Sequence, residues 1–208
     1  MKINHPMPKV LHLEFDSRIE MNLSICRIQE FYESPYDNIK GKYFTLEQFI
    51  RTYSDKEGNI NYFSYWEGFD IPRKSIAEFQ RLFLDISYLE SKILDLFTED
   101  YEYLIATDVS CDPTTLQHEL AHAKYSLDEE YRNKVNQILF NLDGRTLNKM
   151  IKDLLDGEYP DDPYILLDEI HAYLLTSKDF ELQSVFKSVV SEDYEVCRSI
   201  LTNTFNSN

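Results

Sequence analysis

Apolar residues recur along this chain at two spacings, and the dominant spacing changes near the middle. In the first half, Leu11, Leu13 and Phe15 alternate with polar residues, which predicts a strand with one buried face. Residues 60–66 and 101–109 are rich in aromatic and β-branched side chains and predict two further strands. In the second half, apolar residues return every three or four positions, which predicts helices almost throughout. The pattern therefore indicates an α+β fold with a small mixed or antiparallel sheet in the N-terminal half.

Helix signals also occur between these predicted strands. Ile25, Ile28 and Phe31 have helical spacing, although a strand is an alternative there. The sequence Thr45-Leu46-Glu47-Gln48 is a capping box and predicts a short helix that ends near residue 55. Pro72 suits the first turn of a helix whose apolar stripe is Ile76, Phe79, Phe83 and Ile86, and a second helical run follows with Leu89, Ile93, Leu96 and Phe97.

The second half contains several helix starts. Asp112 followed by Pro113 predicts an N-cap and a first helical residue, and so a helix from about 113 to about 125. Ser126-Leu127-Asp128-Glu129 has the capping-box pattern and predicts that another helix begins there. Further helices are expected near 147–155 and 164–176, followed by one or two more.

Length and composition favour a single domain over 1–208. We expect a strand-containing N-terminal lobe over about 1–110 and a helical lobe over about 111–208. With 43% hydrophobic residues the chain can fill a sizeable core, and its five glycines and seven prolines are scattered rather than gathered in a linker.

The net charge of the chain limits the classes of partner that we expect it to bind. The formal net charge of −16 would repel phosphate backbones and anionic membrane surfaces, so neither nucleic acid nor a membrane is an expected partner. The three cysteines are far apart and lack a C-x-x-C spacing, which favours a reducing compartment. No apolar run approaches the length of a membrane span, and prolines interrupt the N-terminal residues where a signal peptide would be apolar. We therefore expect a cytoplasmic protein.

The candidate chemistry lies in one pentapeptide, His118-Glu119-Leu120-Ala121-His122, which is an H-E-x-x-H pattern. On a helix His118 and His122 are one turn apart, so both imidazoles can bind one metal ion from the same face. Glu119 points to the edge of that face, where its carboxylate can act as a general base on a metal-activated water without being a ligand. This arrangement predicts a zinc ion as cofactor, and zinc requires at least a third protein ligand.

The first candidate for that ligand is Glu169, which lies in a predicted helix and is followed one turn later by Ala172. With this E-x-x-A segment the chain resembles the gluzincin-type zinc metallopeptidases, in which a glutamate on a later helix completes H-E-x-x-H. The resemblance implies a zincin-like fold, with the sheet packed on the motif helix. It also implies that His118, His122 and Glu169 bind zinc and that Glu119 activates the water.

Two other residues compete with Glu169. His171 is two positions further on and so faces another side of the helix, where it would suit either a supporting role behind the ligands or the role of a plain surface histidine. Asp128 follows His122 by six residues and resembles the last ligand of the metzincins. Tyr125 stands where that family has glycine, and a bulky residue resists the required turn. We rank Glu169 first, His171 second and Asp128 third.

The sequence thus predicts a zinc-dependent peptide-bond hydrolase whose substrate is a peptide or protein. An exposed edge over 101–109 would pair with the extended substrate. Tyr173 is a candidate hydrogen-bond donor to the oxyanion, with a core or surface role as the alternative. Asp168 is a candidate partner of a ligating imidazole, with a solvated or helix-capping role as the alternative. The rival hypothesis is a catalytically inactive zinc-binding module for interaction or sensing. Substrate preference and oligomeric state stay open.

Overall fold

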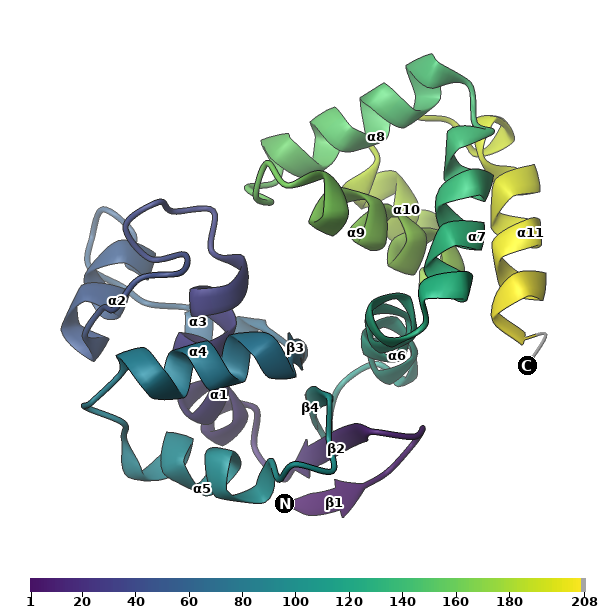
Figure 1. Ribbon diagram of the computed structural model, residues 1–208. Helices are drawn as coiled ribbons and strands as arrows, with labels where there is room; N and C mark the ends of the chain where they lie inside the picture. The colour runs from purple at the N-terminus through teal and green to yellow at the C-terminus, as the bar shows by residue number, and fades with distance from the viewer. Residues whose placement is uncertain (207–208) are drawn as a thin grey trace. The chain divides into compact units, whose positions relative to one another are not determined.

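The computed structural model describes residues 1–206, in which the chain has an α+β fold and divides into two compact units. The first unit comprises Met1–Leu116 and holds a four-stranded sheet with helices around it. The second unit begins at Gln117, and the elements described in it are helical. Figure 1 shows the first unit in purple to teal and the second in green to yellow. The change from mixed to helical structure along the sequence is therefore confirmed.

The sheet consists of β1 (Lys2–Asn4), β2 (Val10–Phe15), β3 (Gly68–Pro72) and β4 (Tyr103–Asp108), in the order β1-β2-β4-β3. Strand β2 pairs with β1 in antiparallel and with β4 in parallel orientation, whereas β3 and β4 are antiparallel. The sheet is therefore mixed. Every residue of β4 is buried, which agrees with its apolar run from Tyr103 to Ala106.

The position of β4 contradicts the prediction that 101–109 is an exposed edge for a substrate. Leu104 of β4 lies opposite Leu11 of β2 on one side and Ile71 of β3 on the other. Both rows of backbone groups of this strand are therefore used within the sheet, and no extended peptide can pair with it. A continuous apolar run, as in β4, is typical of an interior strand, whereas an edge strand is expected to alternate apolar and polar residues.

A strand was also predicted at 60–66, and this prediction is wrong. The segment contains the short helix α3 (Tyr62–Tyr65), and the strand β3 comes directly after it. Tyr62 is buried and its hydroxyl donates to Glu30 at 2.6 Å, so the aromatic residues serve as packing for a helical turn. In β3 only two apolar residues, Phe69 and Ile71, occupy alternate positions, and this pattern is too short to predict a strand from the sequence.

The helices of the first unit are α1 (Arg18–Glu33), α2 (Leu46–Tyr53), α4 (Arg73–Leu82) and α5 (Tyr88–Leu96) together with α3. Helix α1 contacts β2, β3 and β4 as well as α3, α4 and α5, so it is the central helix of this unit. The helical alternative for 25–32 and the capping box at Thr45 are both confirmed, since the Thr45 side chain accepts from the backbone N–H of Gln48. Pro72 ends β3 and precedes α4 instead of lying inside its first turn.

His12 differs from the expectation that β2 buries only one face. Its side chain is only 4% exposed, and its Nε2 lies 2.8 Å from the hydroxyl of Thr107 on the neighbouring β4. Asn4 of β1 approaches the other ring nitrogen at 3.4 Å. Because neighbouring strands supply polar partners on both sides, the imidazole is buried within the sheet.

The connection from β4 to α6 (Pro113–Leu127) is held by polar contacts within the first unit. Arg18 donates to the carboxylate of Asp108 at the end of β4 and pairs with Glu67, both at 2.9 Å. Glu67 in turn accepts from the backbone N–H of Asp112 at 3.2 Å. The Asp112 side chain accepts from the N–H of Thr114 at 2.9 Å, which confirms the predicted helix start.

The second unit contains most of α6, followed by α7 (Glu129–Phe140), α8 (Gly144–Asp156), α9 (Pro163–Thr176), α10 (Asp179–Val185), the 3₁₀ helix η1 (Ser191–Asp193) and α11 (Glu195–Asn206). Helix α9 contacts α7, α8 and α11. Its apolar residues contribute to a separate core, whose fully buried members include Val135, Leu139, Met150, Leu154, Ile170 and Leu174. A helix with buried residues on most of its circumference is held rigidly, so α9 is a stable support for polar side chains.

The start of α7 differs slightly from the sequence prediction. Asp128, not Ser126, is the N-cap, and its carboxylate accepts from the N–H of Tyr131 at 2.9 Å. Helix α6 continues to Leu127, so Ser126 is still helical and cannot act as the cap.

Within residues 1–206, every helix is too short or too polar to cross a membrane.

Candidate metal centre

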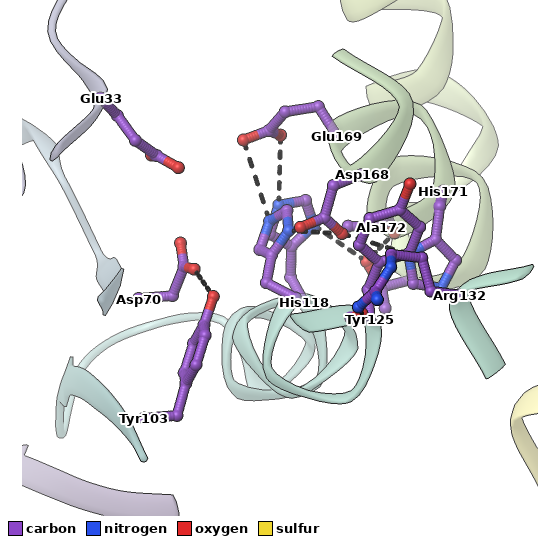
Figure 2. Close-up of polar contacts among 12 residues, drawn as sticks. Glu33, Asp70, Tyr103, His118, Tyr125, Arg132, Asp168, Glu169, His171 and Ala172 are labelled. Carbon is purple, nitrogen blue, oxygen red and sulfur yellow. Dashed lines mark hydrogen bonds and ion pairs between the residues drawn. The ribbon is translucent and has the colours of Figure 1, made fainter. Parts of the chain in front are cut away.

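The side chains of His118, His122 and Glu169 converge within the second unit. His118 and His122 lie on α6 and Glu169 lies on α9. One nitrogen of each imidazole and one carboxylate oxygen all lie within 4.8 Å of one another. Figure 2 shows the Glu169 carboxylate directed toward His118. Helical spacing thus aligns the two histidines, and the packing of α9 on α6 supplies the third donor.

The distances place both oxygens of Glu169 next to the histidines without a direct hydrogen bond. Nε2 of His118 lies 3.8 Å from Oε2 of Glu169, and Nε2 of His122 lies 3.8 Å from Oε1. Hydrogen bonds between nitrogen and oxygen are shorter, at about 2.7–3.2 Å. Two donors that bind the same tetrahedral zinc ion at about 2.0–2.1 Å lie roughly 3.3–3.4 Å apart. The observed spacing is close to that of ligands around one ion.

The Glu169 carboxylate gives a direct test of whether a cation fits. Among the residues that the structure describes, none donates a hydrogen bond to Oε2 of Glu169, and this atom is buried. A buried carboxylate oxygen without a donor costs free energy, and a bound cation would remove that cost. Two imidazoles and one carboxylate are also ligands that zinc accepts. The residues therefore fit a zinc ion, while its binding stays a prediction.

The hydrogen bond behind His118 indicates which nitrogen carries the proton. Nδ1 of His118 lies 3.2 Å from the hydroxyl oxygen of Thr176, and that hydroxyl donates to the backbone carbonyl of Ala172 at 2.8 Å. Because the hydroxyl has a single proton, its oxygen can only accept from His118, whose Nδ1 is then protonated. Nε2 of His118 is left with a lone pair on the side of Glu169. This is the tautomer that a metal ligand needs.

Behind His122 lies a carboxylate. Nδ1 of His122 is 3.1 Å from Oδ1 of Asp168, and both side chains are buried. The same Oδ1 is 3.5 Å from Nδ1 of His171. Burial opposes the ionisation of Asp168, but the imidazoles of His122 and His171 outweigh it and leave the pKa of this carboxyl below its usual value. Asp168 therefore has the supporting position that was predicted as one of its possible roles.

The other two candidates for the third ligand lie elsewhere. His171 is completely buried, and its two ring nitrogens face Asp168 and the hydroxyl of Tyr131. Asp128 caps α7. Of the three candidates, only Glu169 belongs to the group of donors around His118 and His122.

Glu119 lies beside this group. It is buried on α6, and one of its carboxylate oxygens lies within 4.8 Å of a ring nitrogen of His122. Tyr173, the candidate oxyanion donor, packs its ring on His118 with 4.8 Å between centroids, and its hydroxyl oxygen is 2.6 Å from that of Tyr159. These positions place one carboxylate and one aromatic residue next to the histidine pair.

Sequence reasoning missed Thr176 and Tyr131 as partners of the site. Thr176 follows Glu169 by seven residues, two helical turns, so its position on the same face of α9 was readable from the sequence. Tyr131 reaches His171 across the packing of α7 on α9, and sequence spacing contains no signal for such a contact.

Comparisons with protein-family models, with curated proteins and with solved structures found no match to this chain.

Proposed function

We propose that this chain is a zinc-dependent hydrolase that cleaves peptide bonds, with zinc held by His118, His122 and Glu169. The observation that supports this most strongly is the buried Oε2 of Glu169, which lies 3.8 Å from Nε2 of His118 and receives no hydrogen bond among the described residues. The order of the ligands, two from H-E-x-x-H and a glutamate from a later helix, is that of the gluzincins. A zincin-like architecture and a peptide or protein substrate are part of the same proposal.

When bound, zinc would supply a positive charge that polarises a water molecule and the carbonyl group of the substrate. The residues of this chain have three tasks around it. Thr176 and Asp168 hold the proton on Nδ1 of His118 and His122, so that each Nε2 presents a lone pair. Glu169 adds the third donor and a negative charge.

Glu119 is the residue that moves the proton. Its carboxylate accepts a proton from the attacking water and then donates it to the nitrogen of the leaving amine. An amide nitrogen is a poor leaving group until it is protonated, so one carboxylate that serves both steps suits peptide bonds. Its buried position beside His122 keeps bulk water away from this proton.

The test compares the wild type with Glu119→Gln and with Glu129→Gln, which removes an exposed glutamate at the start of α7. Bound zinc is measured by elemental analysis, and hydrolysis with a mixture of fluorogenic peptides. We expect all three proteins to bind zinc and Glu119→Gln alone to lose activity, by about 10²–10⁴-fold for a general base. Equal hydrolysis by Glu119→Gln would refute the mechanism. A wild type that binds zinc but cleaves no peptide would instead support the binding or sensing module.

A further inference from the structure

A buried hydrogen-bonded row of side chains leads from His122 to the interior of the second unit. Asp168 contacts Nδ1 of His122 at 3.1 Å and Nδ1 of His171 at 3.5 Å, and Nε2 of His171 lies 2.7 Å from the hydroxyl of Tyr131. His171 is fully buried and Tyr131 is 4% exposed. In the view of Figure 2, Asp168 lies between His118 and His171. The proton transfer described above for Glu119 uses neither His171 nor Tyr131.

The direction of each hydrogen bond follows from the number of protons available. A carboxylate only accepts, so the two imidazole nitrogens that face Asp168 both carry protons. His171 is then protonated on Nδ1, and in a neutral imidazole Nε2 must accept. Tyr131 therefore donates its hydroxyl proton to His171. Burial raises the pKa of Tyr131, so its phenol keeps the proton that it donates.

We propose that Tyr131 and His171 are positioning residues, which hold the Asp168 carboxylate on His122 and so keep Nε2 of His122 directed at the metal. In the alternative tautomer, His171 would turn a lone pair toward Asp168, and the carboxylate would lose one of its two donors. The Tyr131 hydroxyl disfavours this tautomer, because donation to Nε2 satisfies the lone pair of the Nδ1-protonated ring. The effect on metal binding rests on the proposed function, whereas the tautomer of His171 does not.

Tyr131 is itself held in place by neighbours within the second unit. The ammonium group of Lys124 lies 4.6 Å from the centroid of the Tyr131 ring and donates to the carbonyl of Phe205 at 2.8 Å. The Phe205 ring contacts Tyr131 with 6.1 Å between centroids. A ring held on two sides points its hydroxyl in one direction, which a positioning residue requires.

Tyr125 provides a matched control. It is also buried and packs against His171, with ring centroids 5.6 Å apart and nearly parallel planes. Its hydroxyl, however, donates to the side chain of Asn136 at 2.7 Å and takes no part in the row that leads to His122. Tyr125→Phe and Tyr131→Phe therefore each remove one buried hydroxyl near His171, but only Tyr131→Phe breaks the row.

The first measurement uses the metal-free protein. Long-range ¹H–¹⁵N correlation spectra of the histidine rings show which nitrogen carries the proton. We expect His171 to be protonated on Nδ1 in the wild type and in Tyr125→Phe, and to gain the Nε2-protonated form in Tyr131→Phe. A wild-type His171 protonated on Nε2, or a Tyr131→Phe spectrum identical to that of Tyr125→Phe, would overturn the proposal.

The second measurement is zinc affinity, determined by competition with a chromophoric chelator. We expect Tyr131→Phe to weaken zinc binding by about tenfold, the lower end of the range for residues that support a ligand, and Tyr125→Phe to leave it unchanged. Equal affinity in the two variants would overturn the positioning role. If the wild type binds no zinc, the proposed function fails, while the spectra of the metal-free protein still decide the role of Tyr131.

Discussion

Replacement of Glu169 by glutamine should change stability in opposite directions with and without zinc. In the metal-free protein, Oε2 of Glu169 is buried and, among the described residues, lacks a hydrogen-bond donor. A glutamine amide has the same shape but carries two N–H donors, and the imidazole Nε2 of His118 lies 3.8 Å away. A small rotation of the side chain would turn an unfavourable contact between acceptors into a hydrogen bond.

The expected change in the free energy of unfolding has two contributions, one in the metal-free protein and one from zinc binding. A buried acceptor without a donor costs about 1–3 kcal/mol, so Glu169→Gln should raise the free energy of unfolding of the metal-free protein by about 1 kcal/mol. With zinc at about 1,000 times its dissociation constant, the wild type should gain roughly 4 kcal/mol from binding. The variant should lose most of that gain, because two histidines without the carboxylate are an incomplete set of ligands.

The assay is urea unfolding in the presence of a chelator and in the presence of zinc, followed by circular dichroism. Circular dichroism reports the helices of both units, and the fluorescence of the single tryptophan, Trp66, reports the first unit separately. Glu158→Gln is the control, because it removes the same charge from an exposed position of the second unit. If Glu169→Gln destabilises the metal-free protein and still responds to zinc like the wild type, Glu169 is not a ligand.

Two further predictions concern the partners of buried histidines. Thr176→Val removes the hydroxyl that accepts from Nδ1 of His118, so zinc affinity should fall by about tenfold in chelator competition, whereas Thr176→Ser should retain it. An unchanged affinity in the valine variant would contradict the assigned tautomer. Burial lowers the pKa of His12 in the folded protein. As the pH falls below about 6.5, the ordinary pKa of histidine in the unfolded chain, the unfolded state therefore binds a proton before the folded state does. The free energy of unfolding of the first unit then decreases as the pH falls toward the folded pKa. Urea unfolding followed by Trp66 fluorescence should show this loss in the wild type and a smaller one in His12→Gln, and identical pH dependence in the two proteins would refute it.

Much of the helical structure was readable from local signals. The Thr45 capping box and the start of α6 at Asp112 and Pro113 are decided by side chains within three residues of the backbone groups they satisfy. The predictions failed where contacts between residues far apart in the sequence determine the local structure. The aromatic segment 60–66 became a helical turn because Tyr62 has a partner in Glu30, and β4 became an interior strand because β3 pairs with it.

In the candidate site, too, some features follow from local sequence and others from contacts between distant residues. Local sequence is enough to predict that His118 and His122 share one face of a helix and that Glu119 borders it, because helical periodicity relates residues four positions apart without reference to the rest of the chain. The sequence also ranked Glu169 above His171 and Asp128, from the resemblance, from the different side of the helix that His171 faces, and from Tyr125 at the position of the metzincin glycine. The packing of the helices brings Glu169 to face the imidazoles, puts Asp168 and Thr176 behind them, and lets Tyr131 contact His171. These contacts depend on how α7 and α9 pack against the motif helix, and packing is a property of the whole unit rather than of any local segment.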